Sequence, residues 1–297
     1  MGANSLPLAS DYLALLKPRV MSLVVFTGFA GLVLAPGELH PVLSLVAVSC
    51  IAFAAGGAGA INMWYDRDID ALMARTRNRP IPAGRMAPQK ALAFGFFISV
   101  IAVIVMGATV NWVAAALLAF ANVFYIIVYT VWLKRRTPQN IVIGGAAGAM
   151  PPLIGWAAVT GTMGLESFAL FLLIFLWTPP HFWALALCRA DEYAVAGVPM
   201  LPVVVGKNAT RRQILIYSML LVPVSLAPLA LGIAGAIYAT TAIAMGGGLL
   251  FLAYRIITQQ DDGSARRMFQ YSIFYLFILF LVLIAERLWE LAFVPIQ

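Results

Sequence analysis

An apolar stretch, residues 42–61, runs directly into the polar stretch Asn62-Met-Trp-Tyr-Asp66-Arg67-Asp68-Ile-Asp70. In an α-helix, residues four apart are displaced by only about 40° around the axis, so Asn62, Asp66 and Asp70 share one face and Asp68 lies on another. An amide and two carboxylates offer the oxygen ligands that Mg²⁺ prefers. The alternative is a solvated loop whose acids only balance nearby arginines. Because ionisable groups beside a membrane-length apolar segment are usually functional, we predict a Mg²⁺ site here.

The composition of the whole chain is that of a membrane protein. Of its 297 residues, 63% are hydrophobic and 10% are charged, and the mean hydropathy is +0.94. A soluble domain carries about 25% charged residues, so a soluble globular protein is excluded. Cys50 and Cys188 lie far apart in apolar surroundings, which indicates neither a disulfide framework nor a zinc cluster. The net charge of +7 is small and dispersed, so we expect no nucleic-acid partner.

Apolar stretches of membrane-spanning length recur along the chain and predict nine transmembrane helices. We therefore expect an all-α polytopic membrane protein, with residues 1–297 forming a single integral-membrane domain. The first stretch follows Lys17-Pro-Arg19 without a small-residue cleavage site, so it is expected to be retained. The predicted spans are 20–36, 42–61, 91–110, 113–133, 140–160, 167–187, 214–235, 238–257 and 270–286.

The basic residues predict the orientation of these helices. All of the 19 basic residues except Arg287 lie before the first span or in alternate connections between spans. The positive-inside rule therefore places the N-terminus and these connections in the cytoplasm and the C-terminus outside. The expected location is a bacterial cytoplasmic (inner) membrane.

Two of the cytoplasmic connections, 62–90 and 188–213, are much longer than the others. Each follows the second helix of a set of four, which suggests an internal repeat of four helices. Four crossings return the chain to the starting side, so the repeat is parallel and differs from the inverted repeats common in secondary transporters. This pattern favours an enzyme over a carrier.

Basic side chains follow the acidic residues and predict a diphosphate site. The segment Arg75-Thr-Arg77-Asn-Arg79-Pro-Ile-Pro-Ala-Gly-Arg85 begins five residues beyond Asp70, and Lys134-Arg135-Arg136-Thr-Pro-Gln-Asn140 lies on the same side. Guanidinium groups match phosphate oxygens bidentately while a metal bridges others. The alternatives are charges that only set topology and a snorkelling helix end. The candidates for diphosphate binding are Arg75, Arg79, Arg85, Lys134, Arg135, Asn140 and Arg189.

Two further features are weaker signals. Asp191 and Glu192 follow a helix as the first acidic group does, but the residues four positions later are apolar, so a second carboxylate pair is absent. His181, in Trp177-Thr-Pro-Pro-His181-Phe-Trp183, lies inside an apolar helix near its cytoplasmic end. A lone histidine there is either a hydrogen-bonded structural residue or a ligand.

These motifs together resemble the UbiA-type superfamily of intramembrane prenyltransferases, whose members share nine helices, two long cytoplasmic loops with Asp-rich motifs and a lateral opening for lipid substrates. Asn62-x-x-x-Asp66-x-x-x-Asp70 matches the first of those motifs. Six motifs, in order, are similar to the branch of the superfamily that farnesylates protoheme, although Glu192 stands where that branch usually has Asp. They are Lys17-Pro-Arg19-Val20, Asn62 to Asp70, Arg75-Thr-x-Asn-Arg79-Pro80, Lys134-Arg135 to Gly144-Gly145, Pro180-His181-Phe-Trp183 and Tyr193-x-x-Ala196-x-x-Pro199-Met-Leu-Pro202.

The resemblance implies a reaction and its substrates. A farnesyl group would pass from farnesyl diphosphate to a vinyl group of protoheme IX with addition of water, which gives haem O and diphosphate. Membrane lipid would surround the site, and haem A synthase or a terminal oxidase would be assembly partners. The alternatives are a prenyltransferase with a quinone or aromatic acceptor and a non-enzymatic haem transporter.

The resemblance also implies residue roles. Asn62, Asp66 and Asp70 would be catalytic and would hold Mg²⁺ together with Asp191 and Glu192. Aromatic rings such as those of Trp64, Tyr65 and Tyr129 would stabilise an allylic cation. The implied haem-binding residues are His181, Trp183, Arg19 and Tyr193.

Overall fold

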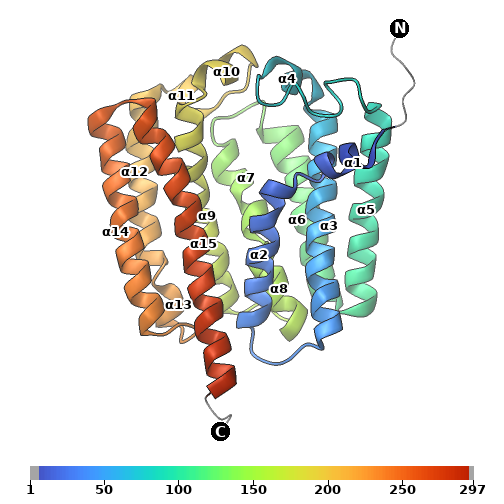
Figure 1. Ribbon diagram of the computed structural model, residues 1–297, viewed down its shortest axis with the longest axis vertical. Coiled ribbons are helices and arrows are strands. Elements are labelled where there is room, and N and C mark those ends of the chain that lie inside the picture. Colours follow the sequence, from blue (N-terminus) through green and yellow to red (C-terminus); the bar gives the residue numbers. More distant parts are fainter. Residues whose placement is uncertain (1–6, 294–297) are drawn as a thin grey trace.

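The computed structural model describes residues 7–293, and within that range every regular element is a helix (Figure 1). The first half contains α1 (Ala9–Leu15), α2 (Pro18–Leu34), α3 (Pro41–Tyr65), α4 (Arg67–Leu72), α5 (Pro88–Thr109), α6 (Trp112–Val123) and the π-helix η1 (Phe124–Leu133). The second half contains α7 (Asn140–Ala149), α8 (Pro151–Thr160), α9 (Leu165–Leu187), α10 (Ala190–Val195), α11 (Leu201–Val204), α12 (Lys207–Val224), α13 (Ala227–Ala230), α14 (Ala236–Gln259) and α15 (Asp262–Phe293).

The predicted spans all fall on these helices. Over residues 7–293, eight helical stretches are long and apolar enough to cross a membrane, and the pair α1–α2, bent by 56°, makes up to nine. Three of the spans consist of two consecutive helices: α6 with η1, α7 with α8, and α12 with α13. The all-helical, nine-span architecture predicted from hydropathy is thus confirmed.

The ends of the two long connections differ from the prediction. Helix α3 continues to Tyr65 and α12 begins at Lys207, so the connections predicted as 62–90 and 188–213 shorten to 66–87 and 188–206. The side-chain amide of Asn62 is hydrogen-bonded to protein groups inside the bundle, so α3 continues beyond the apolar stretch at which hydropathy ends it. One consequence is that Asn62 is a helical residue and not part of a loop.

Both long connections carry short helices at the same end of the bundle, α4 in the first and α10 and α11 in the second (Figure 1). Each connection has two spans of its set of four before it and two after it, which is the order that a parallel repeat predicts. The ninth span, α15, contacts α14 and also α2 and α9, so it joins the two sets.

Glycines allow α2 and α8 to pack with their backbones in contact. A methyl group placed on Gly155 would collide with the carbonyl oxygen of Gly28, and one placed on Gly31 would collide with the carbonyl oxygen of Pro152. Small residues are the usual means by which membrane helices approach closely, because lipid provides no hydrophobic force between helices. The contact between α2 and α8 fixes the start of the chain against the centre of the bundle.

We expect Gly155→Ala to destabilise the protein by about 1–3 kcal/mol or more, because the added methyl group forces α2 and α8 apart. Thermal unfolding of the purified protein in detergent would measure this as a lower Tm. Gly148→Ala is the matched control: Gly148 also lies in a helix, but a methyl group there meets no atom within 4 Å. An equal Tm for the two variants would contradict the packing argument.

Candidate active site

The three residues predicted to share a face are held together across a break in the helix. Helix α3 ends at Tyr65 and α4 begins at Arg67, with Asp66 between them. The amide of Asp66 donates to the carbonyl of Asn62 at 2.9 Å, and the amide of Asp70 donates to the carbonyl of Asp66 at 2.8 Å. The helical spacing of four residues therefore persists through the junction. All three residues are buried, and Asp66 has no exposed surface.

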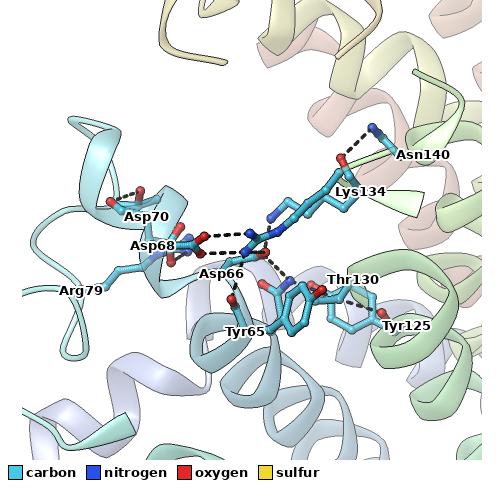
Figure 2. A network of polar contacts seen from close by, with 12 residues as sticks. Tyr65, Asp66, Asp68, Asp70, Arg79, Tyr125, Thr130, Lys134 and Asn140 are labelled. Carbon is cyan, nitrogen blue, oxygen red and sulfur yellow. Dashed lines mark hydrogen bonds and ion pairs between the residues drawn. The ribbon is translucent and has the colours of Figure 1, made fainter. Parts of the chain in front are cut away.

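Asn62 connects three separate elements. Its amide nitrogen Nδ2 donates to Oδ2 of Asp66 at 2.8 Å and to Oγ1 of Thr130, on η1, at 3.1 Å. Its oxygen Oδ1 accepts a hydrogen bond of 2.8 Å from Nζ of Lys17, at the start of α2. The amide thus fixes Asp66 relative to Thr130 and Lys17. Figure 2 shows Thr130 beside this network.

Each buried carboxylate has a cationic partner. Lys134 forms an ion pair with Oδ2 of Asp66, and Nη1 of Arg79 lies 2.6 Å from Oδ2 of Asp70. Burial of a carboxylate is costly unless it is paired, so these cations stabilise the buried carboxylates. The side chains of Lys134 and Arg79 are 18% and 21% exposed, which leaves both within reach of an incoming anion.

One oxygen of the site lacks a hydrogen bond. Oδ1 of Asp66 is buried and has no hydrogen-bond partner among residues 7–293, and the nearest cationic nitrogen in an ion pair with it, Nη2 of Arg135, is 3.6 Å away. Buried polar atoms are nearly always paired, so an acceptor of this kind is suited to bind a cation. Mg²⁺ typically takes one or two carboxylates and completes its shell with water and phosphate oxygens. The residues present therefore fit Mg²⁺.

Arg135 is positioned by Asp68, the acid outside the predicted face. Its Nη1 and Nη2 each lie 2.7 Å from an oxygen of Asp68, and Nη2 also donates to the carbonyl of Tyr65 at 3.0 Å. This bidentate hydrogen bonding lowers the pKa of the Asp68 carboxyl below its usual value. Arg135 therefore lies between Asp66 and Asp68, which are near each other in Figure 2. One edge of its guanidinium group is already bound by Asp68.

The other predicted diphosphate residues have different surroundings. Nε of Arg85 lies 2.8 Å from Oδ1 of Asp11, which ties the first long connection to α1. Nη1 of Arg189 lies 2.8 Å from Oε1 of Glu192 within the second connection. Arg75 is exposed. Buried Asn140 donates from Nδ2 to the carbonyl of Thr137 at 2.7 Å and so shapes the basic turn, while its Oδ1 has no partner within the described range.

The second acidic group stays apart from the first. Asp191 is exposed and Glu192 pairs with Arg189. No three His, Cys, Asp or Glu side chains between residues 7 and 293 are grouped so that they could hold a metal ion. Asp191 and Glu192 therefore do not join Asp66 and Asp70 in one ligand cluster in this structure.

Lys17 and Thr130 belong to the site although the sequence did not single them out as site residues. Lys17 has φ +51° and ψ +55°, a conformation that costs a non-glycine residue roughly 1–3 kcal/mol and is found mostly at functional sites. Thr130 lies on a π-helix, another feature that is frequent at functional sites. Neither the positive φ of Lys17 nor the π-helix around Thr130 can be recognised in the sequence. The charge of Lys17 is explained equally well by membrane topology.

The four residues predicted to bind haem do not share one environment. His181 is buried, and its Nδ1 lies 2.8 Å from Oγ of Ser272 on α15. Trp183 is 1% exposed and packs edge-on against Tyr217 of α12, on the other side of α9. Arg19 is exposed and Tyr193 is half-buried. His181 is thus the one of these residues that has a polar partner on a neighbouring span.

Comparison with known proteins defines the class of this protein. Residues 24–282 match the UbiA prenyltransferase family. The chain belongs to the UbiA prenyltransferase family, and it is an integral membrane protein. A curated relative from Parvibaculum lavamentivorans, named protoheme IX farnesyltransferase, is 60% identical over 94% of this chain and 89% of its own. A relative of the same name from Rhodopseudomonas palustris (strain BisB5) is 56% identical over 95% of this chain and 93% of its own.

Solved structures agree with this fold. A structure concerned with digeranylgeranylglyceryl phosphate synthase has a TM-score of 0.78 at 18% identity and covers 94% of this chain and 98% of its own. A UbiA homologue from Archaeoglobus fulgidus, bound to DMAPP and Mg²⁺, has a TM-score of 0.67 at 17% identity and covers 93% and 99%. At these identities the likeness establishes the fold alone.

Proposed function

We propose that this protein transfers the farnesyl group of farnesyl diphosphate to a vinyl group of protoheme IX, with addition of water, to give haem O and diphosphate. The name of relatives that are up to 60% identical supports the choice of substrates. The observation that carries the chemistry is the buried pair Asp66 and Asp70, each with its own cation. Oδ1 of Asp66 accepts no hydrogen bond from any described residue. Such a site suits a metal-bound diphosphate.

The charges of the site favour cleavage of an allylic diphosphate. Bound Mg²⁺ would be held by Asp66, Asp70 and Asn62 and would neutralise negative charge on the diphosphate. Lys134 and Arg79 are placed to donate hydrogen bonds to its oxygens as the C1–O bond breaks and the electron pair leaves with the diphosphate. In a buried site such donors act more strongly than in water.

The vinyl group of the acceptor is the nucleophile in the formation of the new carbon–carbon bond. The π electrons of the vinyl group attack C1 of the farnesyl cation, and the resulting cation beside the porphyrin takes the oxygen of a water molecule, which releases a proton to solvent. The rings of Trp64 and Tyr65 already face Arg67 and Arg135, at 5.5 and 4.9 Å. Within residues 7–293 no arginine or lysine lies over the ring of Tyr129, so we assign this ring to stabilise the allylic cation.

The test of the function is a reaction with purified protein, farnesyl diphosphate, Mg²⁺ and protoheme, followed by mass spectrometry of the extracted haem. We expect a hydroxyethylfarnesyl haem, equimolar diphosphate and loss of both when EDTA removes the metal. Diphosphate release only with a quinone or phenolic acceptor would support the alternative prenyltransferase. Haem binding without diphosphate release would support a transporter and contradict the proposal.

We propose a cytoplasmic location for the site. Lys134 and Arg135 pair with Asp66 and Asp68 of the first long connection. This connection lies at one end of the bundle, whereas α15 ends at the other (Figure 1). Gln297 itself lies outside the described residues. A reporter fused after Gln297 should therefore be extracytoplasmic, and one inserted at 75–79 should be cytoplasmic. The reverse pattern of alkaline phosphatase and fluorescent-protein activity would overturn this orientation.

A further inference from the structure

The ring of His181 is accessible only at its edge. It stacks on Trp177, one turn earlier in α9, with ring centroids 4.2 Å apart and an angle of 17°. Its other stacked neighbour is Phe269 of α15, at 4.7 Å and 23°. The lone pair of an unprotonated imidazole nitrogen lies in the ring plane, so stacking on both faces does not cover this direction while it restricts rotation of the ring.

Ser272 determines which nitrogen of His181 carries the proton. Its Oγ lies 2.8 Å from Nδ1 of His181 and 2.7 Å from the carbonyl oxygen of Phe269. A serine hydroxyl has one proton to donate. If that proton pointed to Nδ1, two oxygens would face each other at 2.7 Å with no hydrogen between them. Both short contacts are satisfied when Ser272 donates to the carbonyl of Phe269 and accepts from Nδ1–H of His181.

The position of Ser272 is itself fixed by α9. Nε1 of Trp177 donates to the carbonyl oxygen of Ser272 at 2.7 Å, so the two helices are joined at the same residue by two hydrogen bonds. A neutral imidazole that is protonated at Nδ1 has its lone pair on Nε2. In the part of the chain that the structure describes, Nε2 makes no hydrogen bond.

We propose that Ser272 is a positioning residue that selects the Nδ1–H tautomer of His181 and so leaves the Nε2 lone pair for the iron of the haem acceptor. Neutral imidazole is a common ligand of haem iron, and a hydrogen bond to the opposite nitrogen is the usual means of orienting it. The role of the lone pair rests on the proposed function, whereas the tautomer depends only on the contacts between α9 and α15.

The tautomer can be read directly by NMR of the protein labelled with ¹⁵N-histidine, because the chain has only two histidines, His40 and His181. The experiment uses the full chain in detergent, without haem, at a pH where imidazole is neutral. Nε2 is recognised by its couplings to both carbon-bound ring protons. We expect the Nε2 signal of His181 far downfield, as for an unprotonated nitrogen. A protonated Nε2 would overturn the proposal without the need for any variant.

Variants then test the role of Ser272. Ser272→Ala should mix the tautomers of His181, weaken ferric protoheme binding by about 10-fold or more and shift the Soret band of the complex. Ser272→Thr, which keeps the hydroxyl, should restore both readouts. Ser218→Ala is the matched control, because Ser218 is equally buried but donates to Ile214 at 2.7 Å within α12.

An unchanged tautomer and unchanged haem affinity in Ser272→Ala would overturn the assignment. Failure of the proposed function gives a different result: Nε2 would be unprotonated and haem would bind, but no farnesylated haem would form in the presence of farnesyl diphosphate and Mg²⁺.

Discussion

Asp66→Asn should lower turnover by about 10²–10³-fold or more while the protein stays folded. Asn has the size of Asp and can still accept the hydrogen bond from Asn62, so the contacts of α3 with η1 are retained. What is lost is the negative charge that pairs with Lys134 and the anionic oxygen Oδ1, which accepts no hydrogen bond from residues 7–293. Farnesylation rate and Tm, measured on the same preparation, separate loss of chemistry from loss of fold.

Asp70→Asn should resemble Asp66→Asn, and Asp68→Asn is the matched control. Asp68 carries the same charge two residues from each of the others, but its side chain is 62% exposed and binds Arg135 from outside the shared face. We expect a much smaller loss of turnover for Asp68→Asn. If all three variants lost activity equally, the shared face would have no special role.

Lys134→Met should lower kcat/KM for farnesyl diphosphate by about 10²-fold. The same substitution should lower the Mg²⁺ concentration needed for half-maximal rate. Lys134 occupies Oδ2 of Asp66, so it competes with a metal for that carboxylate and repels it, and Met removes the charge while keeping the length of the side chain. The two effects have opposite signs, and a steady-state titration of each substrate measures both.

Arg136→Met is the control for Lys134→Met. Arg136 belongs to the same basic turn and is exposed, and within residues 7–293 its side chain forms no ion pair. We expect near-normal kinetics for Arg136→Met. If the Mg²⁺ concentration for half-maximal rate fell equally in both variants, only the total charge of the turn would matter.

The parts of the site that could be predicted from the sequence are those set by local geometry. Asn62, Asp66 and Asp70 keep the helical spacing of four, because backbone hydrogen bonds carry it through the junction of α3 and α4. The nine spans could be predicted because a bilayer selects for apolar length. The role of Asp68 could not, since it depends on Arg135, 67 residues away in the chain.

The contacts of Lys17 and Arg85 depend on packing between segments that are far apart in the chain. Lys17 reaches Asn62 across 45 residues only because α2 packs beside α3. Arg85 has the spacing of a phosphate ligand, and its Nε is paired with Asp11 of α1. Charge and spacing alone do not distinguish these two outcomes, because each requires the position of a helix that is remote in the chain.

The contacts of α15 have a consequence for how the protein is made. Helices enter the membrane in chain order, and α15 follows all the other described spans. Until it arrives, Phe26 of α2 lacks Phe277, which lies 5.0 Å from it, and Trp177 of α9 lacks the carbonyl of Ser272. The acids and their cations are synthesised long before this, so a nascent chain would hold a charged site in an open ring of helices. Assembly is therefore complete only when the last span inserts and packs against α2, α9 and α14.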